Sequence, residues 1–169
     1  MKTLLVEPNF PIPPKSKNHR DFLPVGLLKL ASYHRAKGDE VKLVRGNQQF
    51  PNFYPNQVKI TSLFTYWSNY VWESVTFYKE AYPKAKVIVG GIYASLMPEH
   101  CKQSGCDEVF EGVDEGVEKF KPAYDLVDVD YQIVHTSRGC LRKCKFCGTW
   151  KIEPKFVSKK SIKDEICSN

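Results

Sequence analysis

Short apolar segments alternate with amphipathic segments along the first 120 residues, and this alternation restricts the fold more than any other feature. Five apolar segments predict strands, at residues 2–6, 40–44, 58–64, 86–89 and 106–110. Helices are predicted between them, at 25–37, from Ser68 to Pro83, between Pro98 and Gly105, and at 113–120. Strands and helices that alternate with short connections predict an α/β fold, in which helices cover both faces of a parallel sheet.

Five such strands predict a flavodoxin-like, doubly wound five-stranded parallel sheet. In such sheets ligands bind beyond the carboxyl ends of the strands, beside the point where the strand order reverses. We therefore expect a first domain over residues 1–120. Residues 121–131 are acidic, contain Pro122 and show no clear period, so they are the expected linker. Residues 132–169 then form a second unit, with a strand at 132–136, a cysteine-rich loop and a helix starting at 160–167.

The composition is that of a packed protein without a membrane span. Of the 169 residues, 42% are apolar and 13% are aromatic, which supports a substantial core. No segment approaches the roughly 20 apolar residues that a membrane helix needs. The apolar run at the amino terminus ends at Val6, before a charge and a proline, so it indicates a buried strand rather than a signal peptide. The expected location is the cytoplasm.

The loop after the sixth predicted strand contains three closely spaced thiols. Cys140, Cys144 and Cys147 follow the spacing C-x-x-x-C-x-x-C within eight residues, so one loop can direct all three at one metal centre. Four-iron clusters are held by cysteine thiolates, normally four, and three would leave one iron open. Zinc is the alternative, but the second half of a tetrahedral site is missing unless His135 supplies a ligand. Cys101 and Cys106 are expected to be small buried hydrophobic residues.

The motif with its flanking residues resembles the radical S-adenosylmethionine (SAM) enzymes. The matching segments are Ser137-Arg138-Gly139-Cys140 and Cys144-Lys145-Phe146-Cys147. The resemblance implies that Cys140, Cys144 and Cys147 hold a [4Fe–4S] cluster whose open iron chelates SAM. A donor such as a flavodoxin or ferredoxin would supply the electron that cleaves SAM to a 5′-deoxyadenosyl radical. Phe146 would pack near the SAM adenine; the alternative is an ordinary core aromatic.

The segment upstream of the motif resembles the cobalamin-binding subfamily of these enzymes. The likeness lies in residues 24–33, 89–94 and 111–116, and it implies a bound cobalamin. Gly90 and Gly91, at the end of a strand, would let a flat macrocycle lie against the backbone. Ser62 and Thr65 would bond its periphery; for all four residues the alternative is an ordinary turn or loop role. The D-x-H-x-x-G pattern of proteins that ligate cobalt through histidine is absent, and residues 17–22 with His19 stand in its place.

Positive charge is concentrated around the cysteines. The net charge is +6, and nine Lys or Arg between residues 138 and 163 face one acid, Glu153. These charges suit an iron–sulfur cluster, a SAM carboxylate or a cobalamin phosphate, and they suit RNA equally well. The substrate class, RNA included, therefore stays open.

Three functions are consistent with these patterns. The first is the N-terminal part of a radical SAM enzyme; a barrel of this family continues through more strand–helix units than the one before Asn169, so we expect this chain alone to be inactive. In that case the second unit is the first strand–loop–helix of a radical SAM partial barrel. The second function is a corrinoid-binding module without catalytic activity, and the third is a zinc-stabilised α/β interaction domain.

Overall fold

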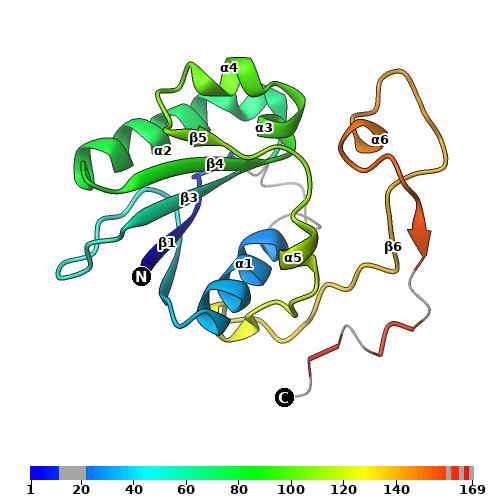
Figure 1. Cartoon of the computed structure of the whole chain (residues 1–169), viewed down its shortest axis with the longest axis horizontal. Coiled ribbons are helices and arrows are strands. Elements are labelled where there is room, and N and C mark those ends of the chain that lie inside the picture. Colours follow the sequence, from blue (N-terminus) through cyan, green and yellow to red (C-terminus); the bar gives the residue numbers. More distant parts are fainter. Residues whose placement is uncertain (12–21, 159–160, 164–165, 168–169) are drawn as a thin grey trace.

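The computed structural model describes residues 1–11, 22–158, 161–163 and 166–167. Its centre is a five-stranded parallel sheet (Figure 1). The strands are β1 (Lys2–Glu7), β2 (Glu40–Arg45), β3 (Gln57–Ser62), β4 (Lys86–Gly91) and β5 (Glu108–Val109). All four pairings are parallel, so the carboxyl ends of the strands meet at one edge of the sheet.

The strand order is β2-β1-β3-β4-β5, which confirms the predicted flavodoxin-like topology. The chain leaves β1 for the outer strand β2 and then returns past β1 to β3. The loops after β1 and β3 therefore diverge, and a crevice opens between them at the carboxyl edge of the sheet.

One face of the sheet is covered completely. It packs against α2 (Ser68–Ala81), α3 (Ile92–Leu96) and α4 (Pro98–Lys102), and η1 (Thr65–Trp67) leads into α2. Leu4, Ile60 and Val89 point to this side, where they meet Val75 and Tyr78 of α2. Because successive residues of a strand point to opposite faces, the neighbours of these residues lie on the other side.

The opposite face is only half covered. The helix α1 (Val25–Ala36) packs over β1 and β2, with Leu27 and Ala31 against Leu5. Over β3, β4 and β5 the only helix on this side, among the residues that the structure describes, is the single turn α5 (Glu115–Glu118), which lies beside α1 (Figure 1). This difference leaves part of the sheet face open, and a cavity lies on it.

Several element boundaries differ from the sequence predictions. Ser68 was expected to cap α2, but it is the first helical residue and its side chain makes no cap hydrogen bond. The helix α3 was not predicted, and β5 has two residues instead of five. The ends of α1 and α2 match the prediction, and Gly38 follows α1 at φ +81°, as a C-terminal glycine should.

The segment expected to be a linker packs against the first domain. It contains η2 (Tyr124–Leu126), and Ala123 is buried beside Leu27 and Ala31. The amide of Ala123 donates to the Leu28 carbonyl at 3.1 Å. Residues 121–126 thus complete the apolar cover of α1.

The second unit is smaller than predicted. Residues 132–136 do not form the expected strand; a two-residue strand, β6 (Ser137–Arg138), follows them and pairs antiparallel with β7 (Val157–Ser158). One helical turn, α6 (Thr149–Ile152), lies between these strands. The described residues of the predicted final helix, 161–163 and 166–167, are not helical. The prediction of a strand–loop–helix unit is therefore wrong for these residues, because the chain turns back into a hairpin.

None of the helices in the described ranges has the length and apolar character that crossing a bilayer requires.

Candidate functional site

One of two cavities, which we call the sheet-face cavity, lies on the open half of the sheet and has a volume of about 360 Å³. Its floor is formed by residues of β3 and β4 that point away from α2, together with Phe110 after β5. Its walls are α1, α5 and the second unit, which contributes His135, Arg138, Ile152 and Glu153. Residues on both sides of the cysteine motif therefore line the same cavity as the sheet.

Gly90 and Gly91 both line this cavity, for different physical reasons. A Cβ on Gly90 would lie 3.6 Å from the Phe110 Cβ, an ordinary contact. Gly91 has φ +105°, and a Cβ there would lie 2.3 Å from the Ser62 carbonyl oxygen. The chain therefore requires glycine at position 91 for its own packing, whereas Gly90 keeps the cavity floor open.

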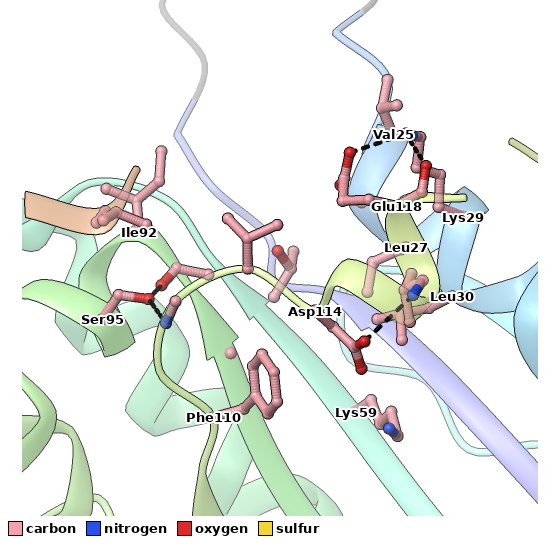
Figure 2. Close-up of a pocket in the computed structure, with 18 of the residues that line it drawn as sticks. Val25, Leu27, Lys29, Leu30, Lys59, Ile92, Ser95, Phe110, Asp114 and Glu118 are labelled. Atoms are coloured by element: carbon pink, nitrogen blue, oxygen red, sulfur yellow. Dashed lines mark hydrogen bonds and ion pairs between the residues drawn. The ribbon is translucent and has the colours of Figure 1, made fainter. Parts of the chain in front are cut away.

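Lys59 stands on the cavity floor without a direct partner. Figure 2 shows its side chain near Asp114, which comes from the loop before α5. Lys59 makes no hydrogen bond or ion pair with the residues that the structure describes, and burial lowers the pKa of its amine. Asp114 is engaged as the N-cap of α5, accepting from the amides of Gly116 and Val117. The cavity therefore contains a lysine amine on a largely apolar floor, and the Asp114 and Glu108 carboxylates act on its charge only from beyond contact distance.

A chain of charges connects the first domain to the second unit. The buried Lys29 amine donates to Glu118 Oε2 at 3.0 Å, a pair seen at the wall of the cavity in Figure 2. Arg138 lies 3.9 Å from the other Glu118 oxygen and 2.7 Å from Glu153. Glu153 also accepts from the Gly139 amide at 2.8 Å. These contacts hold the residue before Cys140 against α1 and α5.

His135 lies beside this chain of charges, with its Nε2 3.5 Å from an Arg138 nitrogen. Burial lowers the pKa of His135, and the neighbouring Arg138 lowers it further. A neutral imidazole is therefore favoured at the cavity wall near neutral pH.

A second cavity of about 360 Å³ lies at the crevice between β1 and β3. It is lined by Phe10 after β1, Phe64 and Trp67 after β3, and residues at the start of α1. Phe10 stacks on Trp67 with ring centroids 5.1 Å apart. Val25, Gly26, Thr61 and Ile92 line both cavities, so the two adjoin along the carboxyl edge of the sheet.

Ser62 and Thr65 do not line either cavity. Ser62 is fully buried; its hydroxyl donates to the Gly90 carbonyl at 2.8 Å and accepts from the Ala94 amide at 3.0 Å. Thr65 is half-buried at the start of η1. Ser62 thus contacts Gly90 and Gly91 from the buried side of the sheet instead of lining the cavity with them, and its hydroxyl supports the junction of β4 with α3.

The cysteine loop lies on the surface, between β6 and α6. Cys140, Cys144 and Cys147 are free thiols and are each partly exposed. The Cys140 sulfur accepts from the Arg142 amide at 3.3 Å, and the Cys147 sulfur lies 3.4 Å from the Thr149 hydroxyl. Across the described ranges, no group of three or more His, Cys, Asp and Glu side chains is arranged to hold a metal ion. The three thiols of the loop are therefore not gathered around one point in this structure.

Phe146 projects into solvent and is 93% exposed. The alternative of a core aromatic is therefore wrong for this residue. Leu141, in the same loop, is also strongly exposed. The apolar side chains of the loop are thus available to a ligand or to a further part of the protein.

Two glycines fix the ends of the loop. Gly139 has φ +72°, and a Cβ there would lie 2.1 Å from the Lys155 carbonyl oxygen. A Cβ on Gly148 would lie 2.7 Å from a methyl group of Leu96 in α3. The loop is therefore anchored at one end by the β6–β7 hairpin and at the other by the sheet domain.

Sequence reasoning missed the residues that shape the two cavities. Lys59, Glu118 and Arg138 are far apart in the sequence and meet only through the fold. The one available signal was Lys59 itself, a charge inside an otherwise apolar strand. His19 lies outside the described residues, so its place is not assigned.

The fold and these cavities define a doubly wound α/β domain with a cysteine-bearing extension. No known family model and no curated protein matches the chain. Five solved chains are similar to it, among them a cobalamin-binding protein from Desulfitobacterium hafniense DCB-2. That structure is 20% identical with a TM-score of 0.48, and the match covers 69% of this chain and 55% of the other. The match spans little more than half of that protein, and a likeness at this level does not establish a shared ligand.

Proposed function

We propose that this chain is the N-terminal part of a radical SAM enzyme, with a cobalamin at the carboxyl edge of its sheet and a [4Fe–4S] cluster in its cysteine loop. The observation that carries the proposal is the shared wall of the sheet-face cavity. His135 and Arg138 precede the motif, Ile152 and Glu153 follow it, and all four line the cavity on the sheet. A ligand bound there would therefore lie next to the segment that carries the three thiols.

The donor set of the loop fits an iron–sulfur cluster. Three thiolates would hold such a cluster with one iron left open, and a backbone amide already donates to one sulfur, as occurs around clusters. Arg142, Lys143 and Lys145 offset the negative charge of a cluster, and all three are exposed. Because a metal centre commonly organises its own ligands, we expect the loop to close when the cluster is loaded.

The residues around the thiols position the loop. When bound and reduced, the cluster supplies the electron that cleaves SAM into methionine and a 5′-deoxyadenosyl radical. Arg138 and Glu153 hold the start of the loop against α5, and Gly148 holds its end against Leu96. Phe146, exposed and next to Cys147, is free to cover the adenine of SAM.

The two adjoining cavities fit a large, mostly apolar ligand with a few polar groups. Each has a volume of about 360 Å³, in the range of ordinary ligand sites, and together they reach from the open sheet face to the switch point. Gly90 leaves the backbone of β4 accessible, and the aromatic pair Phe10 and Trp67 offers a flat surface. Cobalamin, when bound, supplies a cobalt atom that accepts and passes on a methyl group.

The cluster is tested by anaerobic reconstitution of the chain with iron and sulfide. We expect a broad absorption at about 400 nm that is lost when Cys140, Cys144 and Cys147 are all replaced by alanine. The matched control is Cys167→Ala, a partly exposed thiol outside the motif, which should keep the absorption. Stoichiometric zinc without colour would instead support the zinc-stabilised domain.

Cobalamin binding is tested by titration with hydroxocobalamin. We expect saturable binding that weakens at least about tenfold in Gly90→Val, because the added methyl groups would fill the cavity floor. Thr65→Ala is the control, since its side chain lines neither cavity and binding should persist. Saturable binding that is lost in Thr65→Ala and kept in Gly90→Val would place the cofactor elsewhere.

A further inference from the structure

Two cysteines outside the motif lie together at the turn between α4 and β5. Cys101 is in the last turn of α4 and is fully buried, and Cys106 is half-buried just before β5. The Cys106 sulfur lies 3.8 Å from the Cys101 carbonyl oxygen. Gly105, at φ +85°, reverses the chain between the two cysteines.

The two sulfurs have unequal surroundings. The neighbouring Cys101 side chain lowers the pKa of Cys106. The neighbouring Cys106 side chain and burial raise the pKa of Cys101. The pair therefore favours a thiolate on the more accessible sulfur and a protonated thiol on the enclosed one, and the thiolate is the reactive form of cysteine.

A buried hydroxyl without a partner also favours a thiolate on Cys106 rather than on Cys101. The Ser104 hydroxyl, in the turn between the two cysteines, is buried and has no hydrogen-bond partner among the described residues. A buried hydroxyl without a partner is unfavourable, and a thiolate on the neighbouring Cys106 would offer it an acceptor.

We propose that Cys106 and Cys101 form a redox-active pair, in which Cys106 is oxidised by a hydroperoxide and Cys101 resolves the product to an intramolecular disulfide. The inference does not depend on the proposed function, because neither cysteine lines a cavity or belongs to the motif.

The reaction balances in two steps. The Cys106 thiolate attacks the distal oxygen of the hydroperoxide; an S–O bond forms, the O–O bond breaks, and the alkoxide or hydroxide takes a proton. The Cys101 sulfur then attacks the sulfur of the sulfenic acid, and its proton leaves with the displaced hydroxide as water. Sulfur loses two electrons in total, and the peroxide oxygen atoms gain them.

The disulfide would join the end of α4 to the residue that leads into β5. Glu108 and Phe110, on and just after that strand, line the sheet-face cavity. Oxidation of the pair would therefore restrain the chain directly beside the cavity floor.

Peptide mapping of the whole, fully reduced chain in the presence of a metal chelator tests the pair. Lys102 separates the two cysteines, so trypsin places them in different peptides, residues 87–102 and 103–119. After one equivalent of hydrogen peroxide, we expect these peptides to be joined, with a mass lower by two hydrogen atoms than their sum. Cys167→Ser is the control that should leave the product unchanged.

Two variants assign the roles. In Cys101→Val, which keeps the size of a buried side chain, Cys106 should stop at a sulfenic acid that dimedone traps. Its alkylation by iodoacetamide at pH 7 should slow about tenfold as its thiolate becomes rarer. In Cys106→Ala, Cys101 should resist both reagents because it is buried, and circular dichroism should match the wild type.

The proposal is overturned if the wild-type chain accumulates a trapped sulfenic acid without the joined peptides. It is also overturned if Cys106 alkylates no faster than Cys167, or if Cys106 pairs with Cys140, Cys144 or Cys147 instead of Cys101.

Discussion

Buried polar side chains hold the loops of this protein against its core. Tyr78 is fully buried in α2, and its hydroxyl accepts from the Gln48 amide at 3.2 Å and lies 3.2 Å from the Gly46 carbonyl. Burial raises the pKa of Tyr78 to about 12. One hydroxyl therefore ties the long loop between β2 and β3 to the helix behind the sheet.

Tyr78→Phe should lower the free energy of unfolding by about 1–2 kcal/mol, because the Gln48 amide and the Gly46 carbonyl lose a partner. Urea denaturation measures the change. Tyr66→Phe is the matched control, since Tyr66 is 69% exposed and its loss of a hydroxyl should change stability by no more than about 0.5 kcal/mol. Equal effects of the two substitutions would contradict the assigned role of Tyr78.

His34 makes stability depend on pH. It is buried in α1; its Nδ1 lies 2.7 Å from Asp39, and its Nε2 is buried without a partner among the described residues. Burial lowers its pKa from the ordinary 6.5, against the opposing effect of Asp39. Below pH 6.5 the unfolded chain therefore binds a proton that the folded chain takes up only at lower pH.

Stability should consequently fall as the pH is lowered through 6.5 towards the folded-state pKa of His34, and His34→Gln should flatten this slope. Urea titrations between pH 5 and 8 (about the histidine range) measure it. The pKa of Asp39 is lowered, by the amino terminus first and His34 second, so its own contribution is lost only below its ordinary 3.8. An identical slope in both proteins would refute the assignment.

The junction of β4 with α3 is the element on which the open cavity floor depends. Gly90 and Gly91 are adjacent, yet a side chain would clash only at Gly91. The backbone of β3 passes so close to Gly91 that no side chain fits, and the positive φ there disfavours any other residue. At Gly90 the three atoms nearest to an added Cβ all belong to Phe110, at ordinary contact distances of 3.6–3.9 Å.

Gly91→Ala should therefore destabilise the protein by at least about 2 kcal/mol, whereas Gly90→Ala should change stability by less than about 1 kcal/mol. Thermal denaturation of the two variants makes the comparison. A tolerated Gly91→Ala would mean that β4 can move away from β3 at this point.

In the molecule as a whole, the chain after residue 120 has two parts: the first packs with the sheet domain, and the second carries the cysteine loop. Ala123 and Leu126 complete the apolar cluster between α1 and the sheet, and Ala123 also donates to the backbone of α1. The cysteine-bearing segment beyond them is held by charges and by Gly148 against Leu96. Residues 121–126 therefore pack with the sheet domain.

A chain ending at residue 131 should keep the stability of the sheet domain, while one ending at residue 120 should lose about 2 kcal/mol through exposure of Leu27 and Ala31. Urea denaturation followed by circular dichroism measures both. Equal stability of the two chains would show that residues 121–126 are only a linker.

The sequence predicted most of the sheet because its signals are local. Apolar runs, Gly38 and Pro83 mark the ends of β1, α1 and α2 within a residue or two, and short connections determine parallel pairing. The short elements β5 and α5 are shorter than predicted. A segment of a few residues shows little periodicity, so tertiary packing determines where it begins and ends. In the second unit, local pattern suggested a strand and a helix, and long-range pairing of Ser137 with Ser158 produced a hairpin.

What the sequence alone determined is the class of fold and the placement of three thiols in one short loop, because strand periodicity and thiol spacing are properties of neighbouring residues. The tertiary structure decided where the two cavities lie. Lys59, Glu118 and Arg138 reach one cavity only because α1 covers half of a sheet face and the chain returns across the other half. It also decided that the Ser62 hydroxyl bonds the backbone of β4 while Gly90 lines the cavity. These two positions, at the ends of adjoining strands, point to opposite sides of the sheet.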